Sequence, residues 1–247
     1  MSAAEPPTDQ SATLAPANTE NEFGQPVGWA LDYSPPPVPP RTPMIGRYCR
    51  VEPLDPQRHG AELHQAYAKA SNDADWTYLS TGPWPEPGPF IEWLGSVKES
   101  VDPIFFAIVD VATGLCTGLA SYLRIDPGAG VIEVGHIHLS RALQRTPAAT
   151  EAMYLMMQRV FELGYRRYEW KCDDLNAPSR AAAARLGFSY EGTFRQATRY
   201  KGRNRDTSWF SILDREWPAL EAEYRRWLDP DNFDDAGQQR TSLRCRR

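Results

Sequence analysis

A loop that joins an apolar stretch to a helix-like segment carries the first chemical signal in the chain. It runs Gln144-Arg145-Thr146-Pro147-Ala148-Ala149-Thr150, after apolar residues that end at Leu139. Free backbone N–H groups and the positive end of the helix dipole favour an anion such as pyrophosphate at such a start. Ala148 and Ala149 would let a ligand approach the backbone, and Thr146 or Thr150 could add a hydroxyl. A simple capped helix is the alternative, because proline is ordinary in a first helical turn.

A second helix start follows at Asn176. This residue comes directly after an expected strand, so its side chain could either cap the helix or bond a ligand lying along the strand end. Ser179 lies on the first turn of the same helix, where serine commonly only satisfies the backbone. A hydroxyl held there could also donate a proton or a hydrogen bond to a thiolate leaving group. Both interpretations stay open from these residues alone.

Two histidines lie on the apolar stretch that precedes the first loop. His136 and His138 share a strand face because strand side chains alternate, so either could titrate near neutral pH. A His-x-His pair can also ligate a metal, but no third ligand is evident nearby, and packing beside a helix is favoured. We therefore expect no metal site.

An acidic and aromatic segment follows the first expected helix. It runs Asp73-Ala74-Asp75-Trp76-Thr77-Tyr78-Leu79 and leads into Gly82-Pro83-Trp84-Pro85. Acidic and aromatic groups, Trp76 and Tyr78 among them, suit a cationic amine. Aromatic residues in such loops are also often a lid packed on the core, so both interpretations stand.

The apolar periodicity predicts a mixed α/β chain. Strands are expected over 47–54, 104–109, 115–125, 131–139, 168–172, 188–194 and 209–213, and helices over 61–71, 90–97, 147–164, 178–186 and 217–227. Hairpins come first, and strands then alternate with helices. This order is typical of a mixed sheet flanked by helices.

The composition fits a folded enzyme and argues against two kinds of partner. The 247 residues are 41% hydrophobic and 24% charged, which is ordinary for a soluble globular protein. A net charge of −5 gives no overall basic field for nucleic acid or an anionic membrane. The basic stretch Arg195–Arg205 is expected to be a solvated loop, and no aromatic stacking motif is interleaved in it strongly enough to favour RNA. No stretch approaches the roughly 18 apolar residues of a membrane span.

The cysteines and the first residues indicate a cytoplasmic protein. The four cysteines are widely spaced and form no C-x-x-C pair, which favours free thiols in a reducing compartment and gives no support for a zinc site; they are Cys49, Cys116, Cys172 and Cys245. Cys172 has no partner histidine in the sequence that would make it a nucleophile. The N-terminal residues lack the basic start and the apolar run of a secretion signal.

Three regions are expected along the chain. Residues 1–40 are rich in Pro, Ala, Thr, Asn and Glu and end in a proline run, which predicts an extended or mobile arm. The run could dock into an aromatic groove, but a spacer packed loosely on the domain is favoured. Residues 41–228 hold the folded domain. Residues 229–247 begin Asp229-Pro230-Asp231 and are expected to form a flexible tail.

The order and spacing of the motifs resemble the GNAT acetyltransferase superfamily, and within it the RimJ/RimL-like branch. The motifs are Glu133-Val134-Gly135, the Gln144–Ala152 loop and helix, Asn176-x-x-Ser179, and Leu186-Gly187-Phe188 with Tyr190-Glu191-Gly192. The resemblance covers about residues 44–215. It implies a GNAT-like fold with a splayed, mixed but mostly antiparallel sheet flanked by helices. Acetyl-CoA would enter the opening between the strands that end at Leu139 and Cys172.

The resemblance also implies roles for individual residues. The cofactor-binding set would be the backbone of Ile137, His138 and Leu139 for the pantetheine arm, Gln144, Arg145, Thr146, Ala148, Ala149 and Thr150 around the pyrophosphate, and Asn176. Ser179 would lie near the sulfur. Pro147 departs from the family pattern Gln/Arg-x-x-Gly-x-Gly/Ala, which has glycine at this position. Because proline has no N–H, one phosphate donor is missing, and cofactor affinity is the property affected.

These residues predict an acetyl-CoA-dependent N-acetyltransferase that acts in a ternary complex. A neutral amine would attack the thioester directly, with Glu133 as the first candidate proton acceptor and Ser179 assisting the thiolate. An edge salt bridge is the alternative for Glu133. The acceptor would be a primary amine of a protein N-terminus or a small molecule, bound near Trp76 and Tyr78, and the protein a monomer or a homodimer. The competing hypotheses are a non-catalytic GNAT-fold module that binds acyl-CoA or a partner protein, and RNA modification.

Overall fold

The computed structural model describes residues 16–70, 72–235 and 237–245. The chain divides into two compact units at Ser34 and Pro35. The described part of the first unit contains a short antiparallel hairpin, β1 (Thr19–Glu20) and β2 (Pro26–Val27). The Asn21 carboxamide oxygen accepts hydrogen bonds from the backbone N–H groups of Phe23 and Gln25, each 3.0 Å long, which fixes the turn. The rest of the expected N-terminal arm before residue 16 lies outside the described residues.

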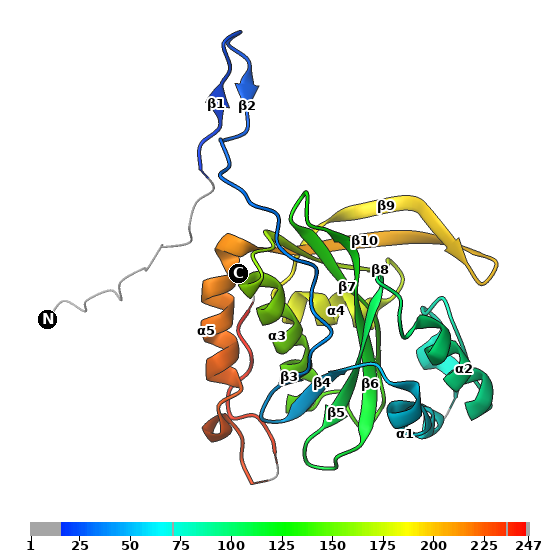
Figure 1. Ribbon diagram of the computed structural model, residues 1–247. Helices are drawn as coiled ribbons and strands as arrows, with labels where there is room; N and C mark the ends of the chain where they lie inside the picture. The colour runs from blue at the N-terminus through cyan, green and yellow to red at the C-terminus, as the bar shows by residue number, and fades with distance from the viewer. Residues whose placement is uncertain (1–15, 71, 236, 246–247) are drawn as a thin grey trace, which may run out of the picture. The chain divides into compact units, whose positions relative to one another are not determined.

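The second unit is built on one eight-stranded sheet (Figure 1). Its strands are β3 (Met44–Ile45), β4 (Cys49–Pro53), β5 (Ile104–Asp110), β6 (Cys116–Asp126), β7 (Val131–Leu139), β8 (Arg167–Asp173), β9 (Ser189–Tyr200) and β10 (Arg203–Leu213). The strand order is β3-β4-β5-β6-β7-β8-β10-β9. Every pair of neighbours is antiparallel except β7 and β8, which are parallel. The prediction of a mixed, mostly antiparallel sheet is confirmed.

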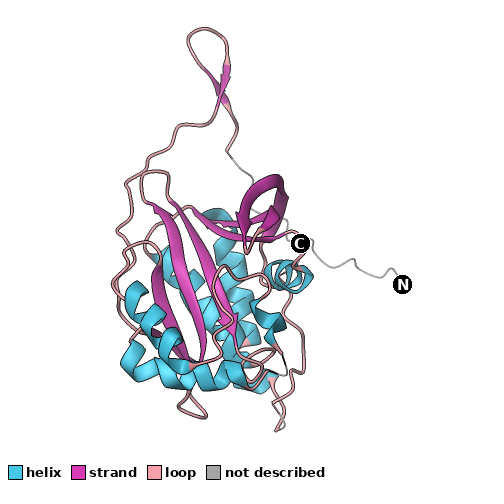
Figure 2. Ribbon diagram, turned by 90° about the vertical axis from the view of Figure 1, so that its right-hand side faces the viewer, coloured by secondary structure: helices cyan, strands magenta, loops and turns pink. Residues whose placement is uncertain are grey.

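Helices cover both faces of this sheet. They are α1 (Pro56–Ala68), α2 (Pro87–Val97), α3 (Pro147–Glu162), α4 (Ala177–Arg185) and α5 (Trp217–Trp227), with short 3-10 turns η1 (Asp73–Trp76), η2 (Asp214–Glu216) and η3 (Pro230–Asn232). Figure 1 shows α3 and α5 on one side of the strands and α1 and α2 on the other. In Figure 2 the α1 and α2 side faces the viewer, and these helices lie in front of the strands. None of the helices in the described part of the chain is long and apolar enough to span a membrane.

Helix α3 holds the edge of the sheet through one buried carboxylate. Glu151 is 5% exposed and accepts hydrogen bonds from the backbone N–H groups of Arg47, Tyr48 and Cys49, at 2.8, 2.6 and 2.8 Å. Gly46 lies so close that a Cβ on it would be 2.3 Å from Glu151 Oε2, so only glycine fits there. The carboxylate thereby satisfies three donors in the β3–β4 turn and fixes α3 against the sheet.

Three sequence expectations differ from the structure. The proline run is partly docked, with Pro36 and Pro39 buried and the Pro37 carbonyl accepting a hydrogen bond from Tyr165, so the folded unit begins before residue 41. Part of the expected flexible tail contacts the main core, where Cys245 is 4% exposed and Leu243 packs against it, while residues 234–235, 237–242 and 244 are exposed. The expected loop Arg195–Arg205 belongs mostly to β9 and β10, which pair as a long hairpin.

We predict that Glu151→Gln lowers the free energy of unfolding by about 2–4 kcal/mol, because an amide NH₂ would then face backbone donors. Urea denaturation followed by circular dichroism measures this change. Glu162→Gln is the matched control, since Glu162 is an exposed residue of the same helix and should change stability by less than about 0.5 kcal/mol. Equal stability of the two variants would contradict this role of Glu151.

Candidate active site

The parallel pairing of β7 and β8 ends in the middle of both strands. It covers Val131–Val134 on β7 and Arg167–Trp170 on β8, whereas β7 continues to Leu139 and β8 to Asp173. Among the described residues, β7 and β8 do not pair with each other beyond Val134 and Trp170. Backbone N–H and C=O groups there can therefore pair with an extended ligand. Two of the carbonyls already accept one hydrogen bond each, that of His138 from the Tyr67 hydroxyl and that of Leu139 from the Gln144 side chain. We call this place the fork, formed by residues 135–139 and 171–173.

A β-bulge bends β7 at the fork. Gly135 pairs with Ser121 and His138 with Leu119, so the two residues between them on β7 face one residue on β6. His136 has φ of 48°, in the left-handed region. A bulge adds local twist and turns the strand away from its regular path. This bulge therefore gives a physical reason for the divergence of β7 from β8.

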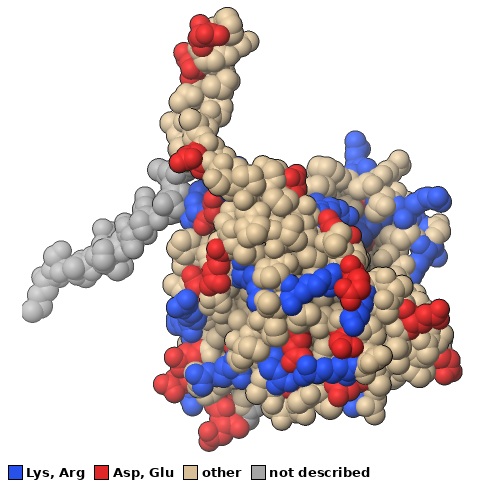
Figure 3. Space-filling view, viewed as in Figure 1, with Lys and Arg blue, Asp and Glu red and all other residues tan. Residues whose placement is uncertain are grey.

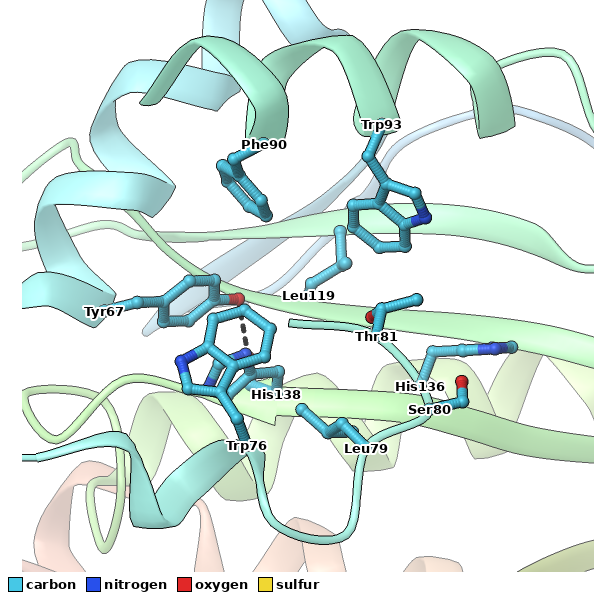
Figure 4. A pocket seen from close by; sticks show the side chains of 10 residues that line it. All are labelled: Tyr67, Trp76, Leu79, Ser80, Thr81, Phe90, Trp93, Leu119, His136 and His138. Carbon is cyan, nitrogen blue, oxygen red and sulfur yellow. Dashed lines mark hydrogen bonds between the residues drawn. The ribbon is translucent and has the colours of Figure 1, made fainter. Parts of the chain in front are cut away.

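The two histidines of β7 line a small aromatic cavity below α2 (Figure 4). The cavity has a volume of about 20 Å³, close to the space for one water. His138 stacks on Tyr67 with ring centroids 3.8 Å apart and meets the edge of Trp76 at 4.2 Å. Burial lowers the pKa of His138 to about 3, and burial together with Arg124 lowers the pKa of His136. The expectation of titration near neutral pH is therefore wrong for His138, whose ring is neutral at pH 7, and burial also disfavours the charged form of His136.

The loop after β7 forms a tight turn ahead of α3. The Ser140 carbonyl accepts hydrogen bonds from the N–H groups of Leu143 and Gln144, at 3.0 and 2.9 Å. The Gln144 carboxamide donates to the Leu139 carbonyl at 2.9 Å, so this side chain supports the end of β7. Arg145 is exposed with φ of 63°, the left-handed region. The turn presents the start of α3 beside the fork.

The first turn of α3 has the geometry of a capped helix. Thr146 is the N-cap and accepts from the Ala149 N–H at 3.2 Å, and Pro147 takes the first position, where its lack of an N–H is tolerated. Ala148 and Ala149 are buried, as small residues can be. The Thr150 hydroxyl is buried and accepts a hydrogen bond from Arg185 at 3.2 Å, which connects α3 to α4. Contact of these residues with a cofactor stays a prediction.

On the other side of the fork, Asn176 and Ser179 begin α4. The Asn176 side-chain oxygen accepts from the Ser179 N–H at 3.1 Å, so it caps the helix, as one of the two sequence interpretations required. The Ser179 hydroxyl accepts a hydrogen bond from Trp170 Nε1 at 3.0 Å, which leaves its own proton to donate. Burial raises the pKa of Cys172, and the nearby Ser179 hydroxyl partly offsets this. Cys172 is therefore a thiol at neutral pH.

Glu133 lies at the base of the fork in a charged ladder across the sheet. It is 3% exposed, with Arg124 Nη1 2.7 Å from both of its oxygens and Lys171 Nζ 3.0 Å from one. Lys171 also binds Glu169 at 2.7 Å and lies 3.7 Å from the centre of the Trp209 ring. Burial raises the pKa of Glu133, and Lys171 and Arg124 partly oppose this. Glu133 therefore forms the salt bridge that was the alternative to a catalytic role. Its raised pKa is also compatible with a role as proton acceptor.

The acidic and aromatic segment packs over the fork. Trp76 is 8% exposed against Tyr67 and His138, which fits the interpretation of a lid packed on the core. The Tyr78 hydroxyl donates to the Leu175 carbonyl at 3.2 Å, in the loop between β8 and α4. Lys201, at the tip of the β9–β10 hairpin, donates a hydrogen bond of 2.7 Å to the Trp76 carbonyl. Figure 3 shows Lys and Arg side chains gathered at this hairpin, and both signs of charge mixed over the rest of that face.

Several residues of the site were missed in the sequence. Lys171 and Arg124 hold Glu133, and the only local signal was the alternation of Glu169 and Lys171 on one strand face. The ion pair between Asp75 and Arg141, at 2.7 Å, had no sequence signal because the residues are far apart in the chain. Among the described residues, no group of three or more His, Cys, Asp or Glu side chains could hold a metal ion.

The fold and these motifs agree with comparisons to known proteins. A family model described as an acetyltransferase (GNAT) domain matches residues 50–189. The chain therefore belongs to the GNAT acetyltransferase family. A crystal structure of a GCN5-related N-acetyltransferase from Brucella melitensis is similar to it at 50% identity and a TM-score of 0.84, covering 86% of this chain and 96% of that one.

Two further relatives are similar to this chain over a shorter length or at lower identity. An uncharacterized N-acetyltransferase p20 from Bacillus licheniformis is 32% identical over 113 residues, which are 45% of this chain and 63% of the relative's length. RimL, a ribosomal L7/L12 alpha-N-protein acetyltransferase, is a structural relative at 19% identity and a TM-score of 0.59, covering 69% of this chain and 93% of that one. The GNAT fold with RimL among its relatives is confirmed, and at 19% identity RimL shows the fold alone.

We predict that Pro147→Ala tightens coenzyme A binding about tenfold, because it adds an N–H to the first turn of α3 beside the expected pyrophosphate. Isothermal titration calorimetry measures the Kd. Pro218→Ala makes the same change at the start of α5 and should leave the Kd unchanged. An unchanged or weaker affinity in Pro147→Ala would show that this N–H is not a phosphate donor.

Proposed function

We propose that this protein transfers an acetyl group from acetyl-CoA to a primary amine by direct attack within a ternary complex. The observation that carries the proposal is the fork, with a helix start on each side of it. Strand edges at residues 135–139 supply amide groups for an extended ligand, α3 supplies an anion-binding terminus, and α4 supplies a hydroxyl. Family membership supports acetyl-CoA as the donor.

In this proposal acetyl-CoA lies along β7. The backbone of Ile137, His138 and Leu139 holds the amides of the pantetheine arm, as a neighbouring strand would. The pyrophosphate lies at the turn of Gln144, Arg145 and Thr146 and at the start of α3. Ala148, Ala149 and Thr150 line this helix start, and Asn176 contacts the cofactor from the opposite side. The neutral, buried His138 supports this arrangement because it adds no charge beside the arm.

Ser179 assists the departing thiolate in this proposal. Trp170 donates to the Ser179 oxygen and thereby orients the hydroxyl, whose proton turns from Cys172 to the cofactor sulfur when acetyl-CoA is bound. When the amine attacks the carbonyl carbon, the tetrahedral intermediate expels the coenzyme A sulfur. A hydrogen bond or a proton from Ser179 stabilises that thiolate.

Glu133 accepts the proton of the attacking amine in this proposal, directly or through water. Its carboxylate lies beside Gly135, with Oε1 3.7 Å from the place a Cβ would occupy there, where the strand pairing ends. Its raised pKa brings it closer to neutral pH than an exposed glutamate, which favours proton transfer. Lys171 and Arg124 hold it in place.

The acceptor enters from the side of α1 and α2 in this proposal. Trp76 and Tyr78 lie on this side, and the acceptor is a protein N-terminus or a small-molecule amine. The four cysteines are free and buried, which fits a reducing compartment, and we propose the cytoplasm as the place of the reaction.

We predict that Ser179→Ala lowers kcat for thiol release about 10–100-fold with little change in the Kd of acetyl-CoA, because the thiolate loses its donor. A thiol-release assay over a panel of small amines and peptide N-termini measures both the activity and this change. Ser189→Ala, at an exposed position on β9, is the control and should keep full activity. Absence of thiol release with every acceptor, despite acetyl-CoA binding, would contradict the proposed function.

We predict that Glu133→Gln lowers kcat at least about 100-fold and removes the acid limb of the pH profile. In the native protein, activity falls as the pH drops through the raised pKa of Glu133, because the protonated carboxyl cannot accept a proton. Glu191→Gln is the control. Glu191 pairs with Arg167, which in turn pairs with Glu169 at the far end of the charged ladder from Glu133, so this variant should keep the acid limb. A glutamine variant at 133 with a native pH profile would exclude Glu133 as the acceptor.

A further inference from the structure

One segment connects both sides of the fork. We call residues 72–78 the strap. On one side, the Asp75 carboxylate pairs with Arg141, which follows the end of β7, at 2.7 Å. On the other, the Tyr78 hydroxyl donates to the carbonyl of Leu175, which follows the end of β8. The strap therefore crosses the place where the two parallel strands have separated.

Arg141 lies within the turn that precedes α3. Hydrogen bonds from the N–H groups of Leu143 and Gln144 to the Ser140 carbonyl close this turn around Arg141. The Arg141 side chain is 57% exposed and donates from Nη2 to Asp75, whose side chain is 19% exposed. A guanidinium has five N–H donors in a fork that matches phosphate oxygens.

We propose that Arg141 is a further coenzyme A-binding residue, and that Asp75 holds it away from the cofactor until the pyrophosphate displaces the carboxylate. This inference rests on the proposed function, because it assumes a pyrophosphate at the start of α3. An exposed carboxylate–guanidinium pair is weak, whereas a pyrophosphate is a more highly charged anion that can bind a guanidinium in two places. The exchange is therefore favourable once the cofactor enters.

When pyrophosphate replaces Asp75 as the partner of Arg141, the strap loses one of its contacts. Asp75 is the strap's ion-pair contact with the β7 side, and after its release the strap is still held by the packing of Trp76 on Tyr67 and His138 and by the hydrogen bonds of Tyr78 and Lys201. Coenzyme A binding thereby leaves the strap in place and frees a carboxylate on the side where a cationic amine would approach. Asp75 and Arg141 act as positioning residues that couple the cofactor to the acceptor side.

Calorimetric titration with coenzyme A alone tests this inference without knowledge of the acceptor. We expect Asp75→Asn to bind coenzyme A about two- to fivefold more tightly than the native chain, because Arg141 is no longer held by a carboxylate. Arg141→Gln should bind about tenfold more weakly. The double variant should match Arg141→Gln, because Asp75 acts only through Arg141.

Asp73→Asn is the matched control, because Asp73 is an exposed carboxylate of the same strap and its loss changes the net charge equally. It should change the Kd less than about twofold. Thermal melts confirm that each variant is folded. Weaker or unchanged binding in Asp75→Asn, or native affinity in Arg141→Gln, would overturn the inference.

The outcome separates this inference from the proposed function. Coenzyme A binding with the expected pattern, but no thiol release from acetyl-CoA with any amine, contradicts the proposed function and leaves the inference standing. Thiol release with native affinities in both single variants contradicts only the inference. No coenzyme A binding by the native chain overturns both.

Discussion

The end of the parallel pairing between β7 and β8 is the constraint on which the site depends. Backbone hydrogen bonds join the strands only as far as Val134 and Trp170, and the bulge at His136 turns β7 away beyond that point. Two helices then begin on opposite sides of the opening, each after a short loop. A continuous ladder would have consumed the edge groups that an extended cofactor needs and would have brought the two helix starts together.

Charges and aromatic rings stabilise the two faces of this opening differently. On one face, Lys171 lies between Glu133 and Glu169, so three buried charges satisfy one another. Buried ion pairs contribute little net stability, but removal of one partner leaves an unpaired buried charge. The ladder therefore holds β7 against β8 and also fixes the Glu133 carboxylate where the two strands separate. On the opposite face Trp170 and Phe188 belong to the main core, and the hydrogen bond from Trp170 Nε1 to the Ser179 hydroxyl anchors β8 to α4.

Local patterns predicted much of the fold, and contacts between distant segments account for the differences. The cap at Asn176 and the apolar periodicity of α3 are local, and they were readable from the sequence. The packed tail depends on Cys245 reaching the core, and the β3–β4 turn depends on Glu151 about one hundred residues away. Only the outer part of the β9–β10 hairpin, residues 195–205, was expected to be a loop, because its exposed, basic residues lack an apolar face. Nothing in local spacing relates Asp75 to Arg141, or Lys171 to Glu133.

Hydrogen–deuterium exchange with and without saturating coenzyme A tests the central claim most directly, because the fork is the place where the backbone pairing of β7 with β8 ends. Residues 135–139 of β7 and 145–149 at the start of α3 should exchange more slowly in the complex, while the β4–β5 ladder stays unchanged. Binding of coenzyme A without added protection in either segment would contradict the account, because the cofactor would then lie outside the fork.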